Sequence, residues 1–139
     1  MNMQSENRKN GDKAEKAVIE HLEELGFDKI DKQATPIKII RVVRRAGAKV
    51  LGWFFHAEKA PIDFICLKDG IYYSIEAKHT ADDSNLHYSR ISQKCVDEMN
   101  KTLEDGGKCF VAWINYKFDV KLIEIFEPDL LMKRGSFKK

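Results

Sequence analysis

The chain has 139 residues with a formal net charge of +2, and 43% of its residues are hydrophobic. We expect one domain over residues 1–139, because this length can bury a core and the composition is that of an ordinary soluble globular protein. No apolar run approaches the roughly 20 residues that a membrane-spanning helix needs, so we expect no membrane contact. The N-terminal stretch MNMQSENRKNGDK is polar throughout, and we therefore expect no signal peptide.

Three cysteines, Cys66, Cys95 and Cys109, show no CxxC or Cys/His spacing. An odd number argues against a full set of disulfides, and two of the three lie in apolar, strand-like runs. The pattern predicts buried free thiols in a reducing cytoplasm and no zinc site.

The N-terminal quarter of the chain reads as an arm followed by a helix. We expect residues 1–10 to be a flexible arm and residues 11–25 to be helical, with Gly26 ending the helix. Helical spacing is visible in Ala14, Ala17, Val18, Leu22 and Leu25. Glu15 falls within this apolar stripe, and the residues alone favour a boundary acid whose carboxylate reaches solvent.

Residues 37–56 read as two β-rich segments around a turn at Ala46-Gly47-Ala48. The basic side chains cluster at and before this turn, with no acid among them: Lys38, Arg41, Arg44, Arg45 and Lys49. Such a segment can follow the phosphates of a nucleic acid. A solvated basic hairpin explains the charge equally well.

The rest of the chain predicts a hairpin, a helix, two strands and a short helix. The hairpin covers residues 62–67 and 71–77 around Asp69-Gly70, and the helix follows from apolar residues four apart between residues 91 and 103. KCFVAWIN and VKLIEIF read as strands, EPDLLMKR as a short helix, and residues 133–139 as a loose tail. This order predicts a mixed sheet with helices packed on it, in an α/β fold that borders on α+β.

Three charged residues, Asp63, Glu76 and Lys78, lie near the ends of the hairpin strands. Pairing around Asp69-Gly70 would bring these ends side by side. Glu76 and Lys78 are two apart on a strand, so their side chains leave the same face. One patch of the surface can therefore hold two carboxylates and an ammonium group.

Two neighbouring carboxylates repel each other unless a cation lies between them. Mg²⁺ prefers such oxygen ligands and keeps several waters, one of which it can acidify for phosphodiester hydrolysis. Lys78 could then orient this water. By spacing alone, a cross-strand salt bridge from Lys78 to Glu76 or Asp63 is the better-supported reading of this pattern.

PID followed by EAK resembles the PD-(D/E)xK nuclease superfamily, with Asp63, Glu76 and Lys78 on the motif positions. More of the chain is similar to the RecU-type Holliday junction resolvases of that superfamily. The similar segments are KQATPIKIIRV, GGKCFVAWI, LIEIF and NGDKAEKAV, the last of which places Glu15 on a fourth catalytic position. The resemblance extends roughly from residue 8 to residue 132.

This resemblance implies a restriction-endonuclease-like core with a protruding basic hairpin, the stalk, at residues 37–56. It implies catalysis by Glu15, Asp63, Glu76 and Lys78. Asp63, Glu76 and the Ala77 carbonyl would bind Mg²⁺, or Mn²⁺ in its place. The expected function is symmetric paired nicking of four-way junction DNA by a homodimer in recombination and repair. Recombination and branch-migration proteins are further partners that the resemblance allows.

The chain departs from the family pattern just before Asp63, where EKAPID replaces a hydroxyl-rich stretch and a glutamine. In that family a glutamine in the second helix contributes to the site. Gln93 is the candidate here, and we assign it to DNA binding. The alternative is that Gln93 is simply an exposed residue of the helix. Two other functions stay open. One is a nuclease of this fold that cuts flaps, nicks or duplex, and the other is a catalytically silent DNA-binding module.

Overall fold

The structure, a computed structural model, describes the backbone of residues 3–33, 37–44, 50–57 and 60–138, and the side chains of residues 11–33 and 60–138. Its elements in chain order are α1 (Met3–Glu24), β1 (Lys29–Lys32), β2 (Ile37–Arg44), β3 (Val50–Ala57), β4 (Phe64–Lys68), β5 (Ile71–His79), β6 (Leu86–His87), the 3₁₀ helix η1 (Tyr88–Arg90), α2 (Gln93–Glu104), β7 (Lys108–Ile114), β8 (Val120–Glu124), the 3₁₀ helix η2 (Pro128–Met132) and β9 (Ser136–Phe137).

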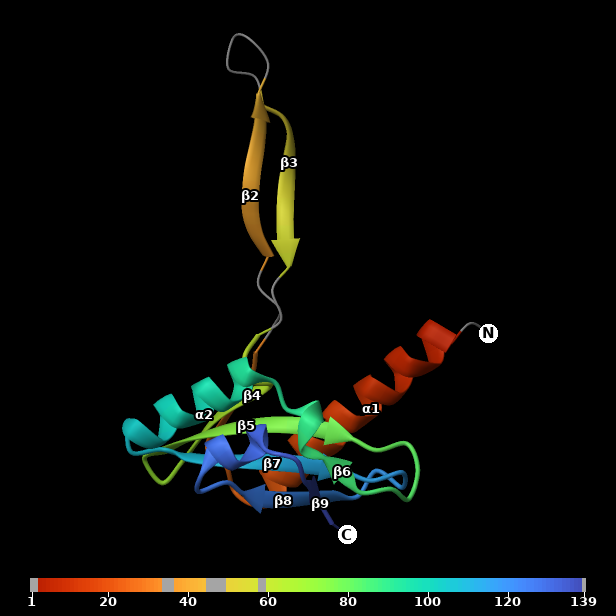
Figure 1. Cartoon of the computed structure of the whole chain (residues 1–139), viewed down its shortest axis with the longest axis vertical. Helices are drawn as coiled ribbons and strands as arrows, with labels where there is room; N and C mark the ends of the chain where they lie inside the picture. Colours follow the sequence, from red (N-terminus) through yellow and green to blue (C-terminus); the bar gives the residue numbers. More distant parts are fainter. Residues whose placement is uncertain (1–2, 34–36, 45–49, 58–59, 139) are drawn as a thin grey trace.

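A five-stranded sheet in the order β1-β4-β5-β7-β8 forms the centre of the molecule (Figure 1). Strands β5 and β7 are parallel, whereas the other neighbours in this sheet pair antiparallel. The parallel pair is connected through α2, as a crossover between parallel strands requires. The expected mixed α/β fold is therefore confirmed.

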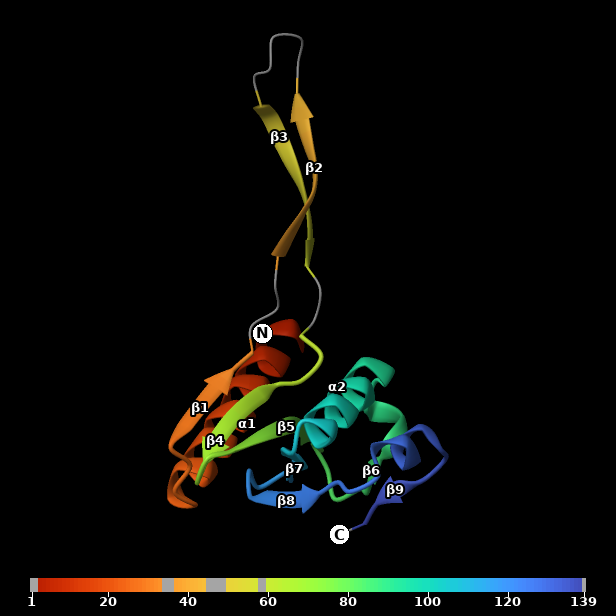
Figure 2. The same ribbon diagram turned by 90° about the vertical axis from the view of Figure 1, so that its left-hand side faces the viewer.

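Helices α1 and α2 cover opposite faces of this sheet, and each face has its own core (Figure 2). Val18 and Leu22 of α1 pack with Phe64 and Ile75. The other core joins α2 to β7 and the C-terminal elements, and includes Cys95, Val96, Met99, Val111, Leu131 and Phe137. Because side chains alternate along a strand, Glu76 next to Ile75 is directed to the α2 side.

Strands β2 and β3 pair antiparallel as a separate two-stranded sheet, which stands away from the central sheet in Figures 1 and 2. Two β segments were expected at residues 37–56, in agreement with this pairing. The expected turn at Ala46-Gly47-Ala48 lies outside the described residues.

Two predictions at the chain ends were wrong. The first helix begins at Met3, so residues 3–10 are helical and not a flexible arm. This stretch contains Met, Gln, Glu, Lys and Arg, which are good helix formers. The tail predicted at residues 133–139 contains β9, which pairs with β6 and buries Phe137 to 9% exposure. This aromatic side chain packs against Tyr88 and joins the core, so the pairing and the apolar contact together hold β9.

Cys66, Cys95 and Cys109 are free and buried, as predicted. Within the described part of the chain, no helix is long and apolar enough to cross a membrane.

Candidate active site

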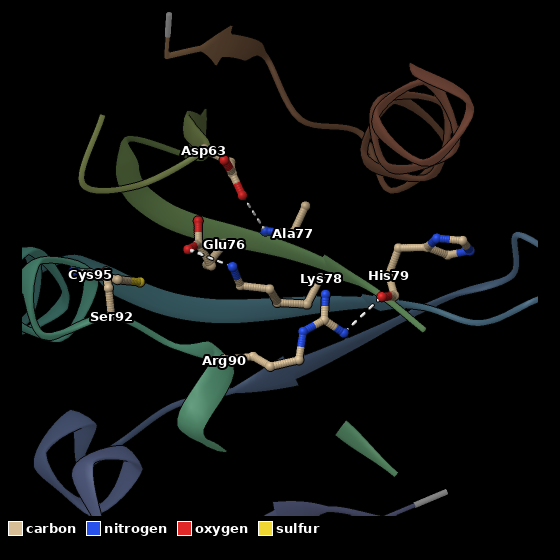
Figure 3. Close-up of polar contacts among 8 residues, drawn as sticks. All are labelled: Asp63, Glu76, Ala77, Lys78, His79, Arg90, Ser92 and Cys95. Carbon is tan, nitrogen blue, oxygen red and sulfur yellow. Dashed lines mark hydrogen bonds and ion pairs between the residues drawn. The ribbon is translucent and has the colours of Figure 1, made fainter. Parts of the chain in front are cut away.

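The hairpin of β4 and β5 brings the predicted acidic residues together. Asp69 and Gly70 both have positive φ, at 52° and 77°, which suits a tight two-residue connection. The register pairs Phe64 with Ile75, so Asp63 lies beside Glu76 at the open end of the hairpin. Asp63 Oδ2 accepts a hydrogen bond of 2.9 Å from the Ala77 backbone N–H, which fixes this carboxylate against β5 (Figure 3).

Glu76 and Lys78 leave the same face of β5 and form an ion pair, as their spacing predicts. Lys78 Nζ lies 3.6 Å from Glu76 Oε2, and the two side chains are only 13% and 4% exposed. Placing both charges away from water carries a desolvation cost that their attraction often fails to offset. Stability alone is therefore a weak explanation for this pair.

Cys95 of α2 lies next to the Glu76 carboxylate (Figure 3). Burial, followed by the charge of Glu76 and a hydrogen bond to it, strongly raises the pKa of the Cys95 thiol. Ser92 caps the helix by accepting a 3.1 Å hydrogen bond from the Cys95 N–H, and thereby sets where α2 begins. Cys95 is thus an α2 side chain that meets Glu76, a contact that the sequence pattern did not indicate.

Gln93 is the first residue of α2, and it is exposed. Its amide donates a 2.9 Å hydrogen bond to Asp97 Oδ1 along the outside of the same helix. The structure therefore does not bring Gln93 to Asp63 and Glu76.

Glu15 reaches the same region from α1. It lines a cavity of about 180 Å³ together with Asp63, Ala77, Lys78 and other residues. Its Oε2 lies 2.6 Å from Lys32 Nζ of β1, and this hydrogen bond raises the pKa of the Lys32 ammonium. Lys32 is a further member of the site that the sequence did not reveal, since only the tertiary fold places β1 beside α1.

The donor set of the site fits a hard divalent cation. No group of three His, Cys, Asp or Glu residues in the described part of the chain is arranged to hold a metal. The predicted ligands are different: two carboxylates, of Asp63 and Glu76, and the Ala77 carbonyl. Mg²⁺ characteristically binds one or two protein carboxylates and keeps several waters, so three protein side chains are not required.

His79 and Arg90 adjoin the site on the far side of Lys78. Arg90 Nη1 donates a 2.8 Å hydrogen bond to the His79 carbonyl, which attaches η1 to the end of β5 (Figure 3). The His79 ring stacks on Phe118 with centroids 5.0 Å apart. Burial, followed by the nearby charge of Arg90, lowers the pKa of His79.

The remaining predicted DNA contacts belong to the β2–β3 pair. Lys38, Arg41 and Arg44 lie on β2, and their side chains are outside the described part. Arg45 and Lys49 lie outside the described residues altogether.

Fold and site together define a mixed α/β protein whose central hairpin carries an acid–acid–lysine group at its open end. The chain belongs to the RecU family, since residues 12–125 match the family model described as Recombination protein U.

The chain is similar to several curated proteins named Holliday junction resolvase RecU. That of Streptococcus gordonii is 30% identical over 88 residues, which are 62% of this chain and 44% of that protein. That of Geobacillus sp. (strain WCH70) is 28% identical over 96 residues, 68% of this chain and 48% of the relative. That of Latilactobacillus sakei is 29% identical over 83 residues, 59% of this chain and 40% of the relative. The matched part thus spans less than half the length of each relative.

Proposed function

We propose that the protein is a Mg²⁺-dependent endonuclease that resolves four-way DNA junctions by paired symmetric nicks. The observation that carries this proposal is the meeting of Asp63, Glu76 and Lys78 at one end of the β4–β5 hairpin, in a chain of the RecU family. The name of these relatives, Holliday junction resolvase, supports the choice of substrate.

Asp63, Glu76 and the Ala77 carbonyl would hold the Mg²⁺ ion, for which Mn²⁺ could substitute. A bound divalent ion supplies Lewis acidity and a water of lowered pKa. The partly buried Lys78 ammonium would orient the attacking water and face the charge that develops on the phosphate. Glu15 would act as an accessory acid at the cavity that it shares with Asp63.

The β2–β3 pair would serve as a basic stalk that enters the open centre of the junction. Lys38, Arg41 and Arg44, followed by Arg45 and Lys49, would contact DNA phosphates there. A four-way junction has two-fold symmetry, so two copies of this chain would place one site on each of two opposing strands. A reducing cytoplasm is the proposed location, which the three free thiols support.

The test uses the full chain and a labelled synthetic four-way junction, with Mg²⁺ and with EDTA. We expect paired nicks at symmetric positions that require the metal. Asp63→Asn and Glu76→Gln should abolish cutting, whereas Glu104→Gln, at an exposed position at the far end of α2, should leave it unchanged. Full cutting by the Asp63 or Glu76 variant would refute the assigned site.

A nuclease of the same fold that prefers flaps, nicks or duplex is the second candidate. A competition between the junction and its own duplex arms separates it from the first, because a resolvase cuts the junction selectively. A folded chain that binds the junction but cuts no DNA with Mg²⁺ or with Mn²⁺ would instead be a DNA-binding module.

A further inference from the structure

A second cavity, of about 550 Å³, lies between η1 and the C-terminal elements. We call it the C-terminal groove. Its polar lining comes from His87, Ser89, Lys133 and Arg134, and none of the described residues that line it is acidic. The charge of its lining thus suits an anionic ligand.

The walls of the C-terminal groove are fixed by contacts on both sides. Strand β6 pairs with β9, and the His87 ring is hydrogen-bonded to Ser136 Oγ at 2.7 Å. The Tyr88 N–H donates a 2.9 Å hydrogen bond to the Gly135 carbonyl, and the Tyr88 ring packs edge-on against Phe137 at 4.8 Å. The groove therefore exists before any ligand binds, which lowers the entropic cost of binding.

The positive charges of the groove are available to a ligand. Lys133 and Arg134 are both exposed, and no described carboxylate forms an ion pair with either of them. An anion would therefore not have to displace an existing partner. Solvent-exposed lysine and arginine side chains of this kind contact the phosphate backbone of nucleic acids without reading its sequence.

The groove is connected to the candidate active site through η1. Ser89, in the middle of η1, lines the groove, and Arg90, at its end, holds the His79 carbonyl directly after Lys78. The 3₁₀ helix η1 thus links the end of β5, which carries Lys78, to one wall of the C-terminal groove.

The residues that complete the groove lie outside the part of the chain that matches the family model, which ends at residue 125. We propose that the C-terminal groove binds the phosphate backbone of the duplex arm that leaves the cutting site. This inference rests on the proposed function, which it extends by a second DNA contact on each protomer.

The experiment measures binding of the full chain to a four-way junction in EDTA, where the DNA stays intact, over a range of salt concentrations. Removing two phosphate contacts by Lys133→Ala together with Arg134→Ala should reduce the slope of log K against log salt by about 2. The dissociation constant should rise about tenfold at low salt. Lys101→Ala together with Lys108→Ala removes the same charge near the other end of α2, and should leave both quantities unchanged.

A junction with single neutral methylphosphonates, scanned along one arm, locates the contact. Wild-type binding should weaken at one or two positions beside the cut, and the Lys133/Arg134 variant should be indifferent to the same positions. If the Lys133/Arg134 variant had the same salt slope as the wild type, or the same methylphosphonate scan, the proposal that the C-terminal groove binds DNA would be refuted. Wild-type protein that neither binds nor cuts the junction would instead overturn the proposed function.

Discussion

Asp63 and Glu76 lie side by side but are held in different ways. Asp63 is fixed by the Ala77 backbone N–H, whereas Glu76 is buried between the Lys78 ammonium and the Cys95 thiol. The Ala77 backbone N–H remains when any side chain is replaced, whereas the ion pair of Glu76 is lost when Lys78 is replaced. The Glu76 environment therefore depends on Lys78 far more than that of Asp63 does.

Lys78→Met should destabilise the fold, because it leaves the Glu76 carboxylate buried without its cation. Removing one partner of a buried pair costs about 3–5 kcal/mol of unfolding free energy. Adding Glu76→Gln to this variant should restore most of the loss, since no buried charge then remains. Urea unfolding of the single and double variants measures both effects.

The exposed Lys101→Met, on α2, is the matched control, with an expected change within about 0.5 kcal/mol. A double variant as unstable as Lys78→Met would show that packing of the lysine stem, and not charge, explains the loss.

From the burial of the Cys66 thiol, we predict that the free energy of unfolding falls at alkaline pH. Burial, aided by the charge of Asp31, raises the pKa of Cys66 from 9.0 to about 11. A group whose pKa is raised by folding stabilises the protein fully below its unfolded pKa, and this contribution is lost as pH rises towards the folded pKa. We therefore expect the free energy of unfolding to fall between pH 9 and pH 11.

Cys66→Val removes the titrating group and keeps an apolar side chain of similar size on β4. Its unfolding free energy should fall less over this pH range than that of the wild type, as measured by urea unfolding at each pH. Burial also raises the pKa of Cys109 to about 11, so Cys66→Val together with Cys109→Val should flatten the dependence further. Equal slopes for all three proteins would contradict this account.

From residue spacing, the site could be predicted only where local geometry determines it, whereas Glu15 of α1 was placed there by the family resemblance. The two-residue spacing of Glu76 and Lys78 fixes a shared strand face, and Asp69-Gly70 fixes the turn that brings Asp63 alongside. No such rule connects Cys95 or Lys32 to these residues, because both reach the site from other elements through the tertiary fold.

Among the helices and strands, those long enough to show a periodic pattern of apolar residues could be predicted from the sequence. Helix α2 and the strands β4, β5 and β7 are long enough to show a period of apolar residues. Strands β6 and β9 have two residues each, too few for any period, and they pair with each other across 49 positions of the chain. The C-terminal groove depends on this pairing, so it could not be foreseen from the sequence.

Phe137→Ala should test how much β9 contributes to the core. Phe137 is 9% exposed and packs against Tyr88, and truncating a buried phenylalanine costs about 3–5 kcal/mol of unfolding free energy. Lys138→Ala, at the next and exposed position, should have little effect. Urea unfolding compares the two variants, and a loss below about 1 kcal/mol for Phe137→Ala would show that β9 is dispensable for folding.

At the scale of the whole molecule, the β2–β3 pair and the central sheet form separate sheets. The composition of residues 37–56, basic and rich in β-branched residues, indicated a hairpin of this kind. Its role as a stalk follows from the proposed function, because positive charge outside the body of the protein is suited to the centre of a branched DNA.

Excision of the β2–β3 pair separates folding from junction recognition. The segment begins and ends at one place, since Lys32 is paired with Phe64 and the Gln33 N–H donates a 2.8 Å hydrogen bond to the Asp63 carbonyl. A four-residue Gly-Ser linker in place of residues 34–59 can therefore close the gap. Both cores lie within the remaining chain, so we expect cooperative unfolding with little change in midpoint.

The excised protein should bind duplex DNA and a four-way junction with similar affinity, as measured in competition, while the wild type prefers the junction. Arg41→Ala together with Arg44→Ala, in the full chain, should weaken junction binding without equalising the two substrates, because the shape of the β2–β3 pair is kept. If the excised protein still prefers the junction, the selectivity arises from the surface around Lys78 and the C-terminal groove. The β2–β3 pair would then have no part in recognising the junction.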